Sequence, residues 1–172
     1  MTAIACACGS VRLEAQGAPM LSAVCHCTSC RTAGQALDAA SGQDPIVDAS
    51  GGTACVLWRK DRLRCIAGGA LLEPHRLMPD SPTRRLVASC CMTPVLLDFT
   101  RGFWASAYRD RVADAPPPTM RLMTGDAPGD VTLPDDGLPR LRGFSGRFMV
   151  KLLATWAMMG FRTPGIAGLG DR

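Results

Sequence analysis

Residues 24–30, VCHCTSC, hold three cysteines at a spacing that suits a metal ion. Cys27 and Cys30 are three positions apart, so a tight turn can bring both sulfurs to one ion. In an extended strand, residues i and i+2 point to the same face, so Cys25 joins Cys27 while His26 points away. We therefore expect three thiolates on one ion and a packing or hydrogen-bonding role for His26. Structural zinc has four protein ligands, whereas zinc with three keeps a position for water or a substrate.

A second group of cysteines lies in ACACG near the N-terminus and in SCCMTP much later in the chain. Strand alternation lets Cys6 and Cys8 face one point, but a tetrahedral site needs two more ligands. Cys90 and Cys91 are the best candidates. Adjacent strand residues point to opposite faces, so these two can share an ion only where the backbone turns between them. Pro94 favours such a turn.

The remaining two cysteines, Cys55 and Cys65, lie alone in apolar runs, and we interpret both as inert buried thiols. The chain has nine cysteines, an odd number, so they cannot all be paired in disulfides within one chain. Residues 1–10 lack the basic and apolar regions of a signal peptide, and no run reaches the roughly 18 apolar residues of a membrane span. We therefore expect a cytoplasmic protein, in which cysteine clusters bind metal more often than they form disulfides.

The formal net charge of +4 is no sign of a polyanionic partner. Metal-bound cysteines are thiolates, so seven of them with two Zn²⁺ ions change the charge by −7 and +4 and leave about +1. We accordingly expect no nucleic acid partner.

Short apolar runs separated by Gly, Pro and Asp fill residues 1–110 and predict strands. They lie at 11–15, 22–25, 54–58, 63–67, 70–78, 86–89 and 95–99. The fold class expected is therefore mainly β, with a first domain over residues 1–112. Three consecutive prolines in DAPPPTM mark a boundary, and residues 113–142 are rich in Gly, Pro and Asp, as in a linker or loop.

Residues 143–172 are expected to form a C-terminal amphipathic helix and tail. Ser145 is the predicted N-cap, and Gly160 followed by Pro164 ends the helix. Its apolar face comprises Phe148, Met149, Leu152, Leu153, Trp156 and Met159, and Arg147, Lys151 and Thr155 fall on the other face. Such a helix docks on its own domain or on a second copy. Peripheral membrane contact is a minority alternative, favoured by Arg142, Arg147, Lys151 and Arg162.

Together, CACG at residues 6–9, CHCTSCR at 25–31, Gly34 and CMTPV at 91–95 resemble the glutathione-dependent formaldehyde-activating and centromere-protein-V-like family. The resemblance covers roughly residues 3–110. It implies a β-tent of short antiparallel strands with two zinc sites. By this resemblance, Cys6 and Cys8 join the later turn in a structural site, and Cys25, Cys27 and Cys30 form a site for thiol substrates. The activity implied is the joining of glutathione and formaldehyde, formally a carbon–sulfur lyase reaction run backwards.

The sequence departs from that family pattern at three positions. Ala88 stands where the pattern has the first cysteine of the later turn, so Cys90 is the nearby substitute. Met92 stands where the pattern has glycine, at a backbone position that often needs positive φ. Gly34 comes one residue early, which indicates an altered loop beside the three-cysteine site.

The function expected is that of a zinc-dependent carbon–sulfur lyase-like protein acting on a small thiol adduct, with Cys25, Cys27 and Cys30 as the catalytic zinc site. Arg31, with Arg84 or Arg85, can hold a substrate carboxylate, and His75 is a candidate proton carrier. The alternative is a non-catalytic, zinc-stabilised binding module whose C-terminal helix supplies the interaction surface. The expected partners are a small thiol such as glutathione and, as an open alternative, a second copy of the chain.

Overall fold

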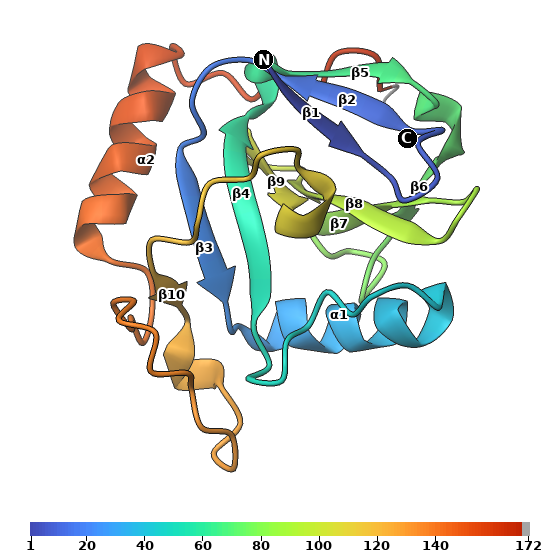
Figure 1. Ribbon diagram of the computed structural model, residues 1–172. Coiled ribbons are helices and arrows are strands. Elements are labelled where there is room, and N and C mark those ends of the chain that lie inside the picture. The colour runs from blue at the N-terminus through green and yellow to red at the C-terminus, as the bar shows by residue number, and fades with distance from the viewer. Residues whose placement is uncertain (170–172) are drawn as a thin grey trace.

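The computed structural model describes residues 1–169, which form two β-sheets flanked by two α-helices (Figure 1). The smaller sheet has the order β1-β2-β5 and is antiparallel, with β1 at Thr2–Ala5, β2 at Arg12–Ala15 and β5 at Leu63–Ala67. The larger sheet has the order β10-β3-β4-β9-β8-β7-β6. Its strands are β3 (Leu21–Cys25), β4 (Thr53–Arg59), β6 (Leu72–His75), β7 (Thr83–Ala88), β8 (Thr93–Phe99), β9 (Trp104–Tyr108) and β10 (Arg121–Leu122).

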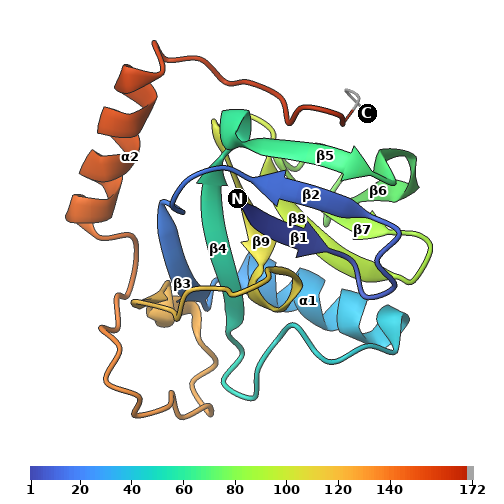
Figure 2. The same cartoon turned by 45° about the horizontal axis from the view of Figure 1, so that its top comes forward.

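The main core lies between the two sheets, which face each other in Figure 2. Ile4 and Leu13 from the small sheet meet Val56, Trp58 and Leu96 from the large one, and all five are essentially inaccessible to water. Burial of these side chains is the main stabilising contribution, at roughly 1.5–3 kcal/mol for each large aliphatic side chain. The sheets thereby fix the positions of the strand ends and connecting segments that carry the clustered cysteines.

The structure confirms a mainly β fold with a C-terminal helix, and every apolar run singled out in the sequence overlaps a strand. The segment expected as a linker, residues 113–142, contributes β10, which pairs in parallel with β3 at Arg121↔Val24 and Leu122↔Cys25. Short 3₁₀ turns complete the described chain: η1 (Lys60–Arg62), η2 (Gly69–Leu71), η3 (Arg109–Arg111) and η4 (Thr124–Asp126).

Helix α1, Thr28–Ser41, is an element that the sequence periodicity does not predict. It buries only Ala33, Gly34 and Leu37, so its apolar stripe is narrow and made mostly of small residues. Local signals define its ends instead. Cys27 is the N-cap, and its sulfur accepts a hydrogen bond from the Cys30 backbone N–H at 3.3 Å. Gly42, at φ 61°, ends the helix in the left-handed conformation.

Helix α2, Gly146–Met158, begins at the predicted N-cap, where the Ser145 hydroxyl accepts a hydrogen bond from the Phe148 backbone N–H at 3.0 Å. It packs on a second, smaller core of Cys55, Leu57 and Phe103. The predicted division of its faces is partly wrong. Phe148 and Leu152 are buried as expected, and so is Thr155, whereas Met149 and Leu153 face solvent. The last residues of the expected tail, 170–172, lie outside the described part of the chain.

Candidate metal centres

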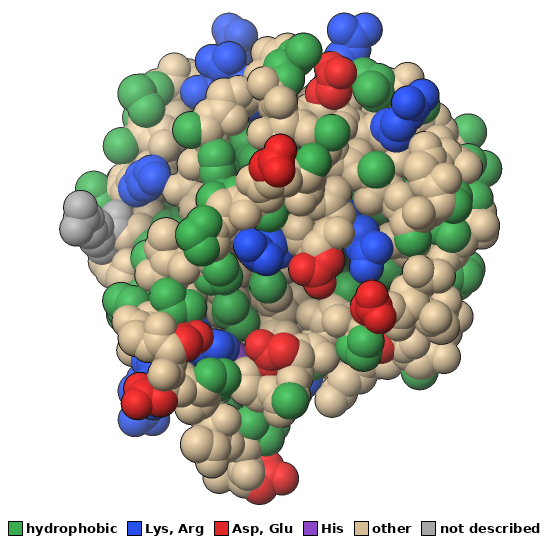
Figure 3. All heavy atoms as spheres, viewed as in Figure 1, with side chains coloured by type: hydrophobic (Ala, Val, Ile, Leu, Met, Phe, Trp, Pro, Cys, Tyr) green, Lys and Arg blue, Asp and Glu red, His purple; other side chains and the backbone are tan. Residues whose placement is uncertain are grey.

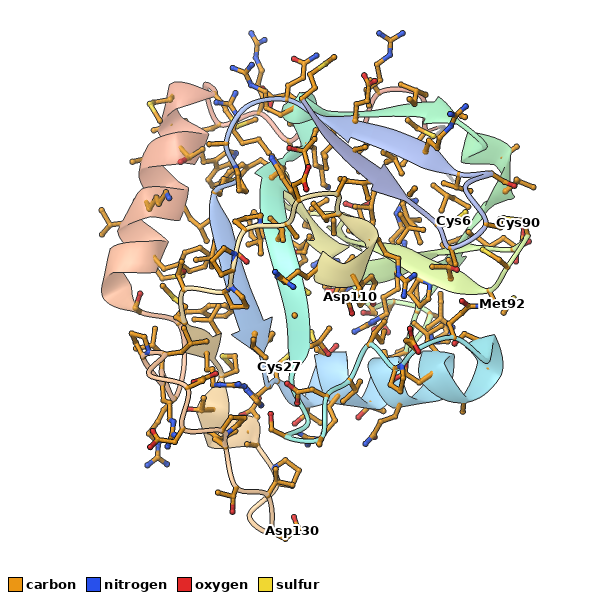
Figure 4. The ribbon with its side chains drawn as sticks, viewed as in Figure 1. Cys6, Cys27, Cys90, Met92, Asp110 and Asp130 are labelled. Carbon is orange, nitrogen blue, oxygen red and sulfur yellow. The ribbon has the colours of Figure 1, made fainter. Side chains whose placement is uncertain are left out.

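Two groups of cysteine sulfurs converge in the structure, at separate places in the molecule. Figure 4 shows Cys6, Cys90 and Met92 together beside the turns that follow β1 and β7, and Cys27 between the end of β3 and the start of α1. The first group holds Cys6, Cys8, Cys90 and Cys91, and the second holds Cys25, Cys27 and Cys30. Within each group all sulfurs lie within 4.8 Å of one another. The structure therefore brings together every cysteine for which the sequence predicts metal binding.

The four-cysteine group has the dimensions of a tetrahedral zinc site. The Cys6 and Cys8 sulfurs are 3.5 Å apart, Cys8 and Cys90 are 3.4 Å apart, and Cys6 and Cys90 are 4.0 Å apart. The Cys90 and Cys91 sulfurs are 3.8 Å apart. A tetrahedral zinc with bonds of about 2.3 Å separates its sulfurs by about 3.8 Å. A soft, all-sulfur donor set of this size fits zinc.

A sharp turn between β7 and β8 lets the adjacent Cys90 and Cys91 reach the same point. The Cys91 backbone N–H donates to the Ala88 carbonyl at 3.2 Å, and Met92 adopts a left-handed conformation with φ 54°. Thr93, fully buried, connects this turn to the other one. Its hydroxyl accepts a hydrogen bond from the Ala7 backbone N–H at 3.3 Å and lies 3.0 Å from the Cys91 sulfur. Cys6 and Cys8 lie in the turn after β1, so a turn and not strand alternation makes them converge.

The three-cysteine group is built by a strand end and a helix start. Cys25 is the last residue of β3, Cys27 is the N-cap of α1, and Cys30 lies in its first turn. The strand alternation expected for Cys25 and Cys27 therefore does not extend through the motif, and the helix brings Cys30 back instead. Among residues 1–169, no fourth cysteine, histidine or carboxylate joins the three sulfurs. The donor set fits a soft metal ion with one coordination position left free of protein ligands.

Hydrogen bonding sets the acidity of these thiols. The thiols of Cys25 and Cys30 hydrogen-bond to the Cys27 sulfur and hold the pKa of Cys27 far below its ordinary value. The Cys30 backbone N–H and the charge of Arg85 act in the same direction. The same bond to Cys27 raises the pKa of Cys25 to about 11. Of the three thiols, Cys27 is therefore the one that loses its proton most readily. In the four-cysteine group, hydrogen bonding to Ser10 lowers the pKa of Cys8 to about 6.

Arg85, on β7, is a buried cation beside the three-cysteine group. Only 1% of the residue is exposed. Its Nη2 donates to the backbone carbonyl of Ser29 at 2.8 Å and to the Ser29 hydroxyl at 2.9 Å. Ser29 lies between Cys27 and Cys30, so the guanidinium is anchored to the metal-binding turn. Its Nε and Nη1 are buried without a hydrogen-bond partner among the described residues. A buried guanidinium with free donors favours negative charge nearby.

His26 is fully buried and takes no part in the three-sulfur group, so the hydrogen-bonding role expected for it is the one observed. Its Nε2 lies 3.1 Å from Nη1 of Arg121, on β10. Burial and the Arg121 charge lower the pKa of His26, which favours the neutral ring. Arg121 is in turn held by Asp136, with Nη2 and Oδ2 2.7 Å apart.

The segment around Asp126 also contacts the three-cysteine motif, through Arg31. The Arg31 Nη1 donates to the carbonyls of Asp126 at 2.8 Å and His26 at 3.3 Å. No sequence pattern connects residues 26 and 31 with residues 121 and 126, so these contacts could not be found from the sequence.

The remaining candidate residues lie outside both sulfur groups. Arg84 donates from Nε to Asp98 Oδ2 at 2.8 Å. His75 is at the end of β6 and is half-buried. Cys55 and Cys65 are buried in the cores, and burial raises the pKa of each thiol, as expected of inert cysteines.

The part of the sequence that matches a known protein family is the N-terminal quarter of the chain. A family model described as glutathione-dependent formaldehyde-activating enzyme matches residues 1–45, which include five of the seven clustered cysteines. This match supports a relationship to that family. No curated protein matches the chain. Among solved structures, a crystal structure of a Rhodobacter sphaeroides protein is similar, with 14% identity and a TM-score of 0.45. The similarity covers 82% of this chain and 99% of that one.

Proposed function

We propose that this chain, related through residues 1–45 to the glutathione-dependent formaldehyde-activating family, binds zinc at both sulfur groups and acts on a small thiol adduct at the three-cysteine group. The observation that carries the proposal is the difference between the two groups. One offers four sulfurs and suits a structural ion, whereas the other offers three and leaves a coordination position for a ligand from outside.

Zinc held by three thiolates would lower the pKa of a thiol at its open position and keep its sulfur nucleophilic. In the joining direction, that sulfur forms a bond to the carbonyl carbon of an aldehyde, and the thiol proton ends on the aldehyde oxygen. In the lyase direction the carbon–sulfur bond breaks, the hydroxyl proton returns to sulfur, and the aldehyde leaves. Neither direction needs an oxidant or a reductant.

The chain's own residues supply the positioning in this proposal. The lowered pKa of Cys27 favours the thiolate, which is the form that binds a metal ion. Arg85 has two buried donors to spare beside the same turn. In this proposal, the positive charge of Arg85 offsets the net negative charge that three thiolates give to a divalent metal site. A substrate carboxylate is a further acceptor for its free donors.

Elemental analysis of tag-free protein tests the metal sites. We expect about two zinc ions per chain in the wild type, and about one in Cys27→Ser and in the double variant Cys8→Ser, Cys90→Ser, each of which leaves one group with only two sulfurs. Cys55→Ala is the matched control, because Cys55 is buried and belongs to neither group, and it should keep both ions. Retention of the wild-type zinc content by Cys27→Ser would overturn the assignment of the three-cysteine group.

Cobalt substitution tests the open position without relying on turnover. Addition of glutathione should increase the thiolate-to-cobalt charge-transfer band in the wild type and in the double variant Cys8→Ser, Cys90→Ser, but not in Cys27→Ser. Turnover is then measured with thiols and aldehydes by NMR. If the cobalt spectrum responds to thiols but no thiol reacts faster than the uncatalysed rate, thiol binding stands and the lyase activity fails.

A second function, a zinc-stabilised binding module, is supported by a different observation. The outward face of α2 is apolar and exposed, with Val150 68% and Leu153 59% accessible. In this case the metal ions only hold the fold, and the cobalt spectrum should not respond to added thiols.

A further inference from the structure

Helix α2 exposes an apolar surface on the side that faces away from the rest of the protein. We call this surface the outer face of α2. Met149, Val150, Leu153 and Met158 are between 49% and 76% exposed, and the flanking Phe144 and Phe161 are 57% and 58% exposed. At 3.6 residues per turn, positions 149, 150 and 153 fall within about 100° of one side of the helix, and Met158 adds exposed apolar surface at its C-terminal end.

The protein's own core does not account for this surface. Phe148, Leu152 and Thr155 already occupy the inner side of the helix against the large sheet. A helix that is apolar on both sides is normally covered on both, and an exposed apolar patch marks an interaction site. The outer face is therefore a docking surface that lacks its partner.

Charge identifies the kind of partner. Between Asp136 and Asp171 the sequence has no acidic residue but has Arg140, Arg142, Arg147, Lys151 and Arg162. Around the grey atoms at the left edge of Figure 3, the coloured side chains over α2 are green and blue. A second copy docked through the same face would bring two such basic segments together, which opposes association. The partner is therefore negatively charged.

Shape favours a flat partner over a groove. A groove that holds an amphipathic helix surrounds most of it, but the inner side of α2 is already occupied. No helix among residues 1–169 is long and apolar enough to cross a membrane. A helix whose apolar side meets the acyl chains while basic side chains meet anionic headgroups lies in the plane of the surface.

We propose that the outer face of α2 binds the surface of a membrane that contains anionic lipids. Met149, Val150 and Leu153 enter the headgroup–acyl boundary, and Arg142 and Arg162 meet the lipid phosphates. The thiol chemistry proposed above plays no part in this contact, so the failure of either proposal leaves the other untouched.

Co-sedimentation of the full-length, zinc-loaded protein with vesicles tests this proposal. We expect binding to mixed phosphatidylcholine and phosphatidylserine vesicles, weaker binding to phosphatidylcholine alone, and loss of binding at high salt. Leu153→Glu should lower the partition coefficient by about tenfold or more. The leucine side chain that inserts into the lipid is replaced by a carboxylate, which is costly to bury among acyl chains and is repelled by anionic headgroups. The double variant Arg142→Glu, Arg162→Glu should lose binding to the anionic vesicles specifically.

Ile66→Glu is the matched control. Ile66 is also an exposed apolar residue, at 47%, but it lies on β5, in the other sheet. It should bind vesicles as the wild type does. Equal loss of binding in Ile66→Glu would overturn the assignment to α2. A dimer that Leu153→Glu dissociates, seen by analytical ultracentrifugation without lipid, would show that a second copy covers the face. Monomeric protein that binds no vesicle would refute the proposal as well.

Discussion

Met92 allows a direct test of the turn that brings Cys90 and Cys91 together, because its backbone conformation has a defined cost. At φ 54° a residue with a side chain is disfavoured by about 1–2 kcal/mol, whereas glycine is not. Met92 is 42% exposed, so replacing it with glycine alone changes stability through lost side-chain contacts as well as through the backbone. Comparison of Met92→Gly with Met92→Ala avoids this difficulty, because both variants lose the same contacts.

The test is which of the two variants, Met92→Gly or Met92→Ala, has the larger free energy of unfolding. At an ordinary strand or helix position, alanine is more stable than glycine by roughly 0.5–1 kcal/mol, because glycine loses more backbone entropy on folding. At position 92 we expect the reverse, with Met92→Gly more stable than Met92→Ala by about 1 kcal/mol. The measurement is urea unfolding of the zinc-loaded variants at one fixed zinc concentration. Met78 is exposed and has negative φ, so its glycine and alanine variants should show the ordinary order. If Met92→Ala equals or exceeds Met92→Gly in stability, the left-handed turn is refuted.

The other predictions concern the surroundings of the two sites. Arg85→Gln should weaken zinc binding at the three-cysteine group by about tenfold or more, as measured by chelator competition, and Arg85→Lys should retain part of the lost affinity. An unchanged zinc affinity in Arg85→Gln would exclude a role for Arg85 in charge balance. Gly34→Ala should destabilise the protein by about 1 kcal/mol in thermal unfolding, because the new Cβ would overlap a Val47 methyl, and a gain in stability would contradict this packing. Lys60→Met should lower the free energy of unfolding by about 1–2 kcal/mol, because it removes the buried ammonium 2.7 Å from Asp98 while Arg84 still pairs with that carboxylate, and a neutral result would contradict a stabilising role for Lys60.

The strands and the convergence of Cys25, Cys27 and Cys30 could be read from the sequence because their signals are local. Apolar runs bounded by turn residues became strands, and cysteines spaced by one or two residues converged. Helix α1 could not be read in this way, because its buried side consists of small residues and one leucine, Leu37.

The surroundings of the sites could not be predicted, because they depend on contacts between distant parts of the chain. The convergence of the adjacent Cys90 and Cys91 sulfurs depends on the turn in which Met92 has a positive φ. The contacts of Arg85 with Ser29 and of Arg121 with His26 join residues 56 and 95 positions apart. Such pairs leave no periodic pattern in a single sequence.

The two sulfur groups differ in how much chain they enclose. Cys25, Cys27 and Cys30 lie within a few residues, so a metal ion there closes almost no loop. Cys6 and Cys90 are 84 positions apart, so a metal ion at the other group ties the first turn of the chain to one beyond its middle. A cross-link that closes a loop of this length restricts the unfolded chain by about 4–5 kcal/mol at room temperature. A chelator that empties both groups would therefore remove thiol binding through one of them and much of the resistance to unfolding through the other.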